Sequence, residues 1–267
     1  PLARKFHTGL GRAAVVYEEI VEGGSTRFLA VYESDVAGSG DVGPIRSIRE
    51  SDIELVRMFG NIPVAYSGAN DGVKAIVRTS ARKKYLVDAS YDAIPGAYRL
   101  GAQRKDARNF FAGPTTLARL KPGSRPRDIG FRFGPVGPTG IPASSAVAAF
   151  SGTTKVQVKY IAATNTWQVL QNGQLMSGVA PTNIILQRVT VRKSRFRDTN
   201  GFPTPYTKST GAGTVTVLRD GQRFAGTWKR AGFGATRFLD AKGTDITLRP
   251  GITWVLLVPT AGSVAFS

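Results

Sequence analysis

Apolar and polar residues along the first half of the chain follow strand-like and helix-like patterns in turn. Short β-branched and aromatic runs at Arg27–Tyr32 and Pro63–Ser67 predict two strands. Residues Glu50–Phe59 space their apolar side chains as a helix does, with Ser51 as the predicted N-cap, and Gly72–Thr79 is predicted as a second helix. Strands that alternate with helices are typical of an α/β layer.

Two further segments complete the first half of the chain. Ala13–Val21 is apolar on one face, is compatible with either a helix or a strand, and ends at Gly23-Gly24. Pro114–Leu120 begins with a proline, a residue that is favoured in the first turn of a helix, and therefore predicts a third helix.

The second half of the chain favours strands. Lys155–Tyr160 alternates between apolar and polar side chains, and the pairs Asn172-Gly173 and Asp220-Gly221 predict tight hairpin turns. Asn183–Arg197 is predicted as one long strand whose polar side is almost entirely cationic, and Thr253–Val258 as another strand. The predicted fold class is therefore α+β, with an N-terminal α/β unit followed by a mostly antiparallel β-rich unit.

The charge of the chain is large and unevenly distributed. The formal net charge is +18 over 267 residues. Residues 1–124 hold 18 Lys and Arg against 13 Asp and Glu, whereas residues 125–267 hold 18 against 5. This change of composition predicts two domains: 1–124, an α/β unit with a candidate anion site, and 125–267, a basic β-rich unit. Such an excess of positive charge indicates anionic partners, among them nucleic acid, anionic lipid and phosphate-bearing wall polymer.

The residue types exclude several kinds of chemistry. The chain has no cysteine, which rules out disulfides, thiolate zinc sites and thiol catalysis. Its single histidine, His7, has no second histidine with which to form a metal site, so no metal, cofactor or catalytic residue is predicted. No apolar run approaches the ~18 residues of a membrane-spanning helix. A noncatalytic role is favoured over an enzyme.

A group of acidic residues precedes the Gly23-Gly24 break. Glu18 and Glu22 would share one face if this segment were helical. Such a pair can act as general acid and base. It can also be solvated, or can anchor nearby arginines.

Arginines at the ends of predicted strands give the best site signal, because guanidinium groups bind phosphate and carboxylate with two parallel hydrogen bonds. In open α/β sheets, ligands collect at strand ends. The predicted ligand-binding residues are Arg27, Arg46, Arg49, Arg104, Arg108 and Asn109. The residues predicted to support them are Glu18, Glu22, Thr26 and Ser47. Internal salt bridges from these arginines to Glu18, Glu22 and Glu50 are the alternative, and both arrangements can coexist.

The cationic side of the long predicted strand gives a second candidate surface. Its residues are Arg188, Arg192, Lys193, Arg195 and Arg197, predicted to contact anionic polymer or lipid head groups. A charged edge strand that resists aggregation has the same pattern. Nucleic acid is not favoured as the partner, because few aromatic residues accompany the cations and no nucleic-acid-binding motif is present.

Two blocks of the first half resemble a known family. Val15–Ser34 reads VVYEEIVEGGSTRFLAVYES, and Val42–Val56 reads VGPIRSIRESDIELV. Together with Ala180–Gln187, Asp220–Arg230 and Leu248–Pro259, they are similar to the YerB-like lipoprotein family, a domain of unknown function, over both of its domains. In one place the chain departs from the family, which has a histidine before the asparagine at the position of Arg108.

The resemblance implies a bacterial protein outside the cytoplasm, either secreted or membrane-anchored as a lipoprotein through an N-terminal anchor not represented in this sequence. The leading hypothesis is a noncatalytic cell-envelope protein that binds an anionic envelope polymer or lipid phosphate. One alternative is a polyprenyl-pyrophosphate-dependent phosphotransferase similar to the LytR-CpsA-Psr proteins. Another is an interaction module for cell-wall synthesis enzymes.

Overall fold

A computed structural model describes residues 7–33, 40–101, 109–137, 140–198 and 201–267. The chain forms two compact units, each built from separate stretches of sequence. Unit 1 comprises Pro1–Arg12, Tyr32–Asp128 and Ser194–Thr204. Unit 2 comprises Ala13–Val31, Ile129–Lys193 and Pro205–Ser267. The change of unit at Asp128 lies near the predicted division between residues 124 and 125, and each unit also takes a short stretch from the other part of the sequence.

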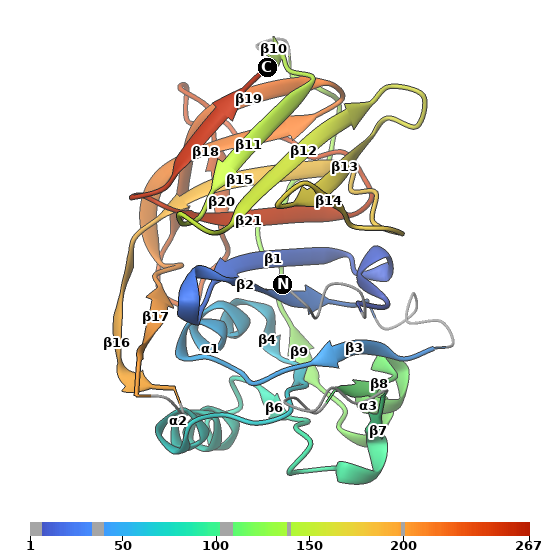
Figure 1. Cartoon of the computed structure of the whole chain (residues 1–267), viewed down its shortest axis with the longest axis vertical. Helices are drawn as coiled ribbons and strands as arrows, with labels where there is room; N and C mark the ends of the chain where they lie inside the picture. The colour runs from blue at the N-terminus through green and yellow to red at the C-terminus, as the bar shows by residue number, and fades with distance from the viewer. Residues whose placement is uncertain (1–6, 34–39, 102–108, 138–139, 199–200) are drawn as a thin grey trace. The chain divides into compact units, whose positions relative to one another are not determined.

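Unit 2 is built on two β-sheets (Figure 1). The larger sheet has the strand order β10-β19-β18-β15-β21-β1-β2, and β20 also pairs with β19. Its strands are β1 (Val15–Ile20), β2 (Thr26–Val31), β10 (Ile141–Pro142), β15 (Asn183–Val189), β18 (Gly211–Arg219), β19 (Gln222–Arg230), β20 (Arg237–Leu239) and β21 (Thr253–Pro259). The smaller sheet, in the order β14-β13-β12-β11-β22, contains β11 (Ser145–Ala149), β12 (Lys155–Ile161), β13 (Thr166–Gln171), β14 (Gln174–Leu175) and β22 (Ser263–Phe266).

The core of unit 2 lies between these sheets, where β11 packs against β21 and β13 against β15. Strand β21 is buried at every position, as is expected of an apolar central strand that is covered on both faces. Strand β21 runs parallel to β1 and to β15, whereas the other pairings in the two sheets are antiparallel. Trp167 and Trp254 lie in this core, and all three tryptophans of the chain, Trp228 included, are at most 2% exposed.

The two predicted hairpins are confirmed. Asn172 and Gly173 join β13 to β14 with φ angles of 46° and 77°. Asp220 and Gly221 join β18 to β19 with φ angles of 51° and 69°. Positive φ at both central residues is the requirement of the hairpin turn that Asn-Gly and Asp-Gly favour, so local chemistry fixes these two registers.

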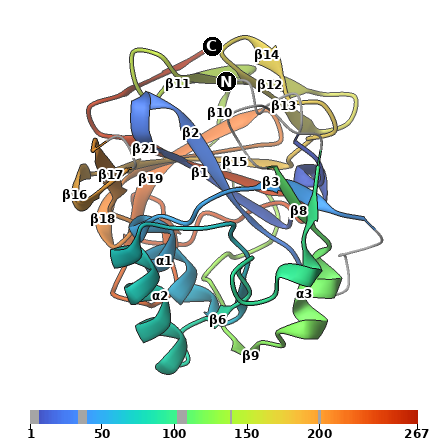
Figure 2. The ribbon, with the colours of Figure 1, turned by 60° about the horizontal axis from the view of Figure 1, so that its bottom comes forward.

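Unit 1 contains the three α-helices of the described residues and several short strands. The helices are α1 (Glu50–Val56), α2 (Asp71–Arg82) and α3 (Pro114–Leu120). The strands are β3 (Val42–Ile45), β4 (Gly60–Asn61), β5 (Pro63–Val64), β6 (Val87–Asp88), β7 (Arg99–Leu100), β8 (Phe110–Ala112) and β9 (Ser124–Pro126). Helices α1 and α2 pack side by side (Figure 2) and bury the apolar side chains Ile53, Val56, Val73 and Val77. None of the described helices has the length and apolar composition needed to cross a membrane.

The structure corrects two expectations about individual elements. Helix α1 is capped at Arg49, not Ser51, because the Arg49 backbone N–H donates to Asp52 Oδ2 at 2.7 Å while Ser51 is buried inside the helix. The long strand expected over residues 183–197 is broken at Thr190 into β15 and β16 (Val191–Arg197), and β16 pairs with β17 (Pro203–Thr207). The ambiguous segment Ala13–Val21 forms strand β1. The predicted α+β fold class is confirmed.

The N-terminus of α2 depends on a side-chain cap. The Asn70 side chain accepts a hydrogen bond from the Gly72 N–H at 2.8 Å. We expect Asn70→Ala to lower the free energy of unfolding of unit 1 by about 0.5–2 kcal/mol, and Asn70→Asp to preserve most of it, because aspartate caps as well as asparagine. Denaturation followed by far-ultraviolet circular dichroism measures this loss. Equal stability of the alanine variant would show that the cap contributes nothing.

Candidate functional site

Three of the predicted site residues lie in one loop of unit 1. The Arg46 loop, residues 46–49, joins β3 to α1 and contains Arg46, Ser47 and Arg49. Its backbone is fixed by a neighbouring segment, since the Arg46 carbonyl accepts from Ser67 N at 3.1 Å and Ile48 N donates to the Gly68 carbonyl at 3.0 Å. The loop is therefore held in place from both of its ends.

The segment beside the Arg46 loop follows a parallel pair of strands. Strands β5 and β6 run parallel, and the pairing continues beyond them through Ala89 N to Val64 O at 3.1 Å and Tyr91 N to Tyr66 O at 2.9 Å. Residues 67–70 follow the carboxyl end of β5, lie beside the Arg46 loop and lead into α2. The loop thus lies at the kind of sheet edge where α/β proteins bind their ligands.

Arg46 and Arg49 differ in what their side chains do. Arg49 Nη1 donates to the Ser47 carbonyl at 3.2 Å and so helps to hold the loop. Arg46 is half-buried, and no hydrogen-bond acceptor or carboxylate among the described residues contacts its guanidinium group. Because its guanidinium has no partner among the described residues, Arg46 is the residue of this loop best suited to bind an external anion.

Asn109 lies near Arg46. Strands β3 and β8 are antiparallel with Ile45 opposite Phe110, so the next residues along, Arg46 and Asn109, lie at the same end of the pair. Asn109 is 2% exposed, and its carbonyl accepts a hydrogen bond from Gly101 N at 2.8 Å. The structure therefore brings together Arg46, Ser47, Arg49 and Asn109. The predicted residues Arg104 and Arg108 lie outside the described residues.

Arg27 belongs to unit 2. It lies on β2, directly opposite Glu19 on β1, and Glu22 begins the turn between these two strands. The convergence of Arg27 with the Arg46 loop stays a prediction.

Glu18 sits at the centre of a buried hydrogen-bond network in unit 2. Its carboxylate accepts from Gln171 Nε2 at 2.6 Å, Thr26 Oγ1 at 2.7 Å and Trp254 Nε1 at 3.2 Å. The Glu18 side chain is fully buried, and its donors come from β13, β2 and β21. The carboxylate thus joins the two sheets of the unit. Gln171 was not predicted from the sequence, although the alternation of Trp167, Val169 and Gln171 along β13 indicates that a polar side chain points into the core.

The predicted basic strand presents most of its cations to solvent. Arg192, Lys193, Arg195 and Arg197 on β16 are exposed, and the guanidinium groups of Arg192 and Arg195 lie over the rings of Tyr206 and Phe196. Arg188 lies on β15 instead. Its Nη2 donates to the carbonyls of Gly262 at 2.7 Å and Thr260 at 2.8 Å, so it ties two chain segments together.

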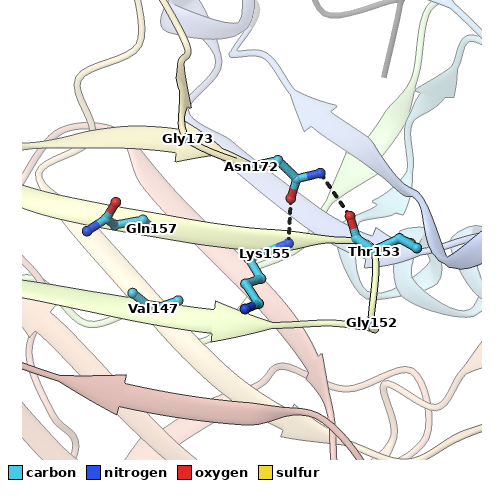
Figure 3. Close-up of a pocket in the computed structure, with 7 residues that line it drawn as sticks. All are labelled: Val147, Gly152, Thr153, Lys155, Gln157, Asn172 and Gly173. Carbon is cyan, nitrogen blue, oxygen red and sulfur yellow. Dashed lines mark hydrogen bonds between the residues drawn. The ribbon is translucent and has the colours of Figure 1, made fainter.

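A shallow pocket of about 350 Å³ lies over the smaller sheet of unit 2 (Figure 3). Its lining residues are Val147, Gly152, Thr153, Lys155, Gln157, Asn172 and Gly173. The Asn172 side chain accepts from Lys155 N at 2.7 Å and donates to the Thr153 carbonyl at 2.9 Å, so its amide is occupied in holding the turn. Lys155 is the one charged residue in the lining, and none of the predicted site residues contributes to it.

Among the described residues, no group of three or more acidic or histidine side chains could hold a metal ion.

Comparisons with known proteins identify the family. Residues 2–127 match the N-terminal domain, and residues 146–255 the C-terminal domain, of the family described as "Protein of unknown function (DUF3048)". A stretch of 81 residues, 30% of this chain, is 38% identical to "Putative lipoprotein YerB" of Bacillus subtilis (strain 168) and covers 23% of that protein's length. The crystal structure of the YerB protein from Bacillus subtilis has a similar fold, with a TM-score of 0.79 at 20% identity, over 99% of this chain and 90% of that one. The protein therefore belongs to the DUF3048 family and carries both of its domains.

Proposed function

We propose that this protein is a noncatalytic protein of the bacterial cell envelope that binds an anionic ligand at the Arg46 loop. Its similarity to a protein named as a lipoprotein supports a location outside the cytoplasm, on a membrane, because lipoproteins are held at membranes by their lipid. The ligand would carry phosphate or carboxylate, since a guanidinium pairs with either group through two parallel hydrogen bonds.

One observation carries the proposal. Arg46 is half-buried at a sheet edge, in a loop whose backbone is fixed by Ser67 and Gly68, and no described residue accepts a hydrogen bond from its guanidinium group. The fixed backbone places this arginine at the site before the ligand arrives, which reduces the entropy that the loop loses on binding. Ser47 follows Arg46 in the loop, and Asn109 lies at the same end of the β3–β8 pair, so both are candidates for further polar contacts to the ligand.

Calorimetric titration of the chain with inorganic pyrophosphate and, separately, with succinate tests this function. We expect saturable binding that weakens as ionic strength rises, because charge-assisted contacts at a partly open site are screened by salt. The stronger of the two ligands identifies phosphate or carboxylate as the recognised group. Absence of saturable binding of either anion would contradict the proposal.

The phosphotransferase alternative is distinguished by turnover. A transferase needs a divalent ion to stabilise the charge that develops on a pyrophosphate leaving group. Magnesium-dependent conversion of a lipid-linked pyrophosphate would therefore show that the protein is an enzyme and would overturn its noncatalytic assignment, whereas binding without conversion supports the proposal.

A further inference from the structure

Helix α2 of unit 1 has a strongly basic outer surface. Val73, Val77 and Ser80 are buried on its inner side, whereas Arg78 and Arg82 lie one turn apart on the exposed side. Lys83 and Lys84 follow at its end and are also exposed. Among the described residues, none of these four cationic side chains has an ion-pair or hydrogen-bond partner, and Asp71 is the only acidic residue of the helix.

The end of β16 extends this basic surface. The Phe196 ring packs directly on the first turn of α2, where a Cβ atom at Gly72 would lie 2.2 Å from Phe196 Cε1. Asn70 Nδ2 also donates to the Arg197 carbonyl at 3.1 Å. These contacts hold the end of β16 beside the start of α2 (Figure 1), and this end of the strand carries the exposed residues Arg195 and Arg197. We call the combined set the α2 surface: Arg78, Arg82, Lys83, Lys84, Arg195 and Arg197.

An exposed aromatic side chain adjoins the α2 surface. Phe202 is 65% exposed, the most exposed of the large apolar side chains in the described residues. Its backbone is held firmly, since Phe202 N donates to Asp198 Oδ1 at 2.8 Å and the Phe202 carbonyl accepts from Asp198 N at 2.9 Å. Arg197 Nη1 donates to the Gly201 carbonyl at 2.7 Å, so the cation is bonded to the residue that directly precedes Phe202.

We propose that the α2 surface and Phe202 dock on a bilayer rich in anionic lipid. Clustered arginines and lysines are attracted to the negative potential of such a membrane. An aromatic ring beside them can enter the headgroup region, where aromatic residues are favoured. A soluble polyanion would use the same cations but would gain nothing from Phe202, so the exposed ring favours the bilayer. This inference is independent of the Arg46 loop and of its ligand.

Cosedimentation of the full chain with vesicles tests the role of the charges. We expect binding to vesicles of equal parts phosphatidylglycerol and phosphatidylcholine at low ionic strength, and no binding to phosphatidylcholine alone. The double variant Arg78→Glu, Arg82→Glu should lose at least about tenfold in vesicle affinity. The matched control Lys229→Glu, Lys242→Glu changes the net charge equally at exposed positions of unit 2 and should bind nearly as well as wild type. Equal loss in both double variants, or no binding of the wild type, would overturn the proposal.

A fluorescent reporter at the aromatic position tests insertion. The native tryptophans are buried, so Phe202→Trp introduces an exposed fluorophore whose signal is obtained by subtracting the wild-type spectrum. We expect a blue shift on addition of phosphatidylglycerol vesicles and quenching by brominated lipid, together with several-fold weaker binding of Phe202→Ser. An unshifted spectrum, or a chain that binds soluble polyphosphate but not vesicles, would overturn the bilayer as the partner. Circular dichroism confirms that each variant is folded.

Discussion

Replacement of Glu18 by alanine is expected to lower the free energy of unfolding of unit 2 by about 3–5 kcal/mol, because buried donors left without an acceptor cost ~1–3 kcal/mol each. The carboxylate is the common acceptor of Gln171, Thr26 and Trp254, and the site is closed to water. The indole of Trp254 would lose its acceptor in the core, and the amide of Gln171 would lose its contact of 2.6 Å while keeping one of 3.3 Å to Thr26 Oγ1. The cavity left by the missing side chain adds to the loss.

Tryptophan fluorescence during chemical denaturation measures this effect in unit 2 alone, because all three tryptophans lie in that unit. Glu18→Gln should lower the free energy of unfolding less than the alanine variant does. Glutamine keeps one acceptor oxygen, but its NH2 group is a donor that faces the other donors of the network. Thr26→Val removes one of the donors and should cost ~1 kcal/mol. An alanine variant as stable as wild type would show that the network does not hold the two sheets together.

Arg46→Ala is expected to weaken the binding of pyrophosphate by about 10- to 150-fold, since a hydrogen bond to a charged group contributes ~1.5–3 kcal/mol. The fold should be unaffected, because the fixed contacts of the Arg46 loop are made by its backbone. Titration calorimetry at constant ionic strength gives the ratio of dissociation constants.

Two variants make this measurement specific. Arg119→Ala removes an exposed arginine from α3 and should leave the affinity nearly unchanged, as a control for net charge. Arg46→Lys keeps the charge but loses the two-pronged geometry, and should recover only part of the affinity. If Arg46→Ala binds as tightly as the wild type, Arg46 is not part of the site.

Features set by local chemistry were predictable from the sequence. The Asn172-Gly173 and Asp220-Gly221 turns require positive φ, which those residues adopt readily, so both hairpins were predicted correctly. Helix α2 was predicted over Gly72–Thr79, and its buried residues Val73, Val77 and Ser80 fall on one face. Ser51 has the chemistry of an N-cap, but the cap lies two residues earlier, at Arg49, and Ser51 is buried inside the helix, which local preference could not indicate.

Features set by distant pairing were not predictable. Strand β1 lies beside β21, with Val15 opposite Thr253, and nothing in either segment encodes this choice of partner. The chain also leaves the larger sheet at Thr190. Strand β15 is mostly buried between β18 and β21, whereas β16 pairs with β17 and is largely exposed to solvent. Residues 183–197 contain no glycine or proline that would mark a break, so they were predicted as one strand.

The candidate site and the buried network likewise contain residues that were predictable from the sequence and residues whose role depends on distant contacts. Arg46 and Arg49 were predicted as arginines at a strand end, with Ser47 as a supporting residue, and the pairing of β3 with β8 places the predicted Asn109 at the same end as Arg46. Trp254, by contrast, is 236 residues from Glu18 along the chain, and its role in the network appears only in the folded protein. Phe202 was not predicted because an isolated apolar residue in a loop carries no periodic signal.

Nuclear magnetic resonance of the arginine Nε–H groups during titration with pyrophosphate tests the central claim most directly. Each arginine gives its own signal, and the signal that disappears in Arg46→Lys is that of Arg46. We predict that this signal shifts and saturates at lower pyrophosphate concentration than any signal from the exposed arginines of α2 or β16. An Arg46 signal that stays unchanged while those exposed arginines respond would contradict an anion site at the Arg46 loop.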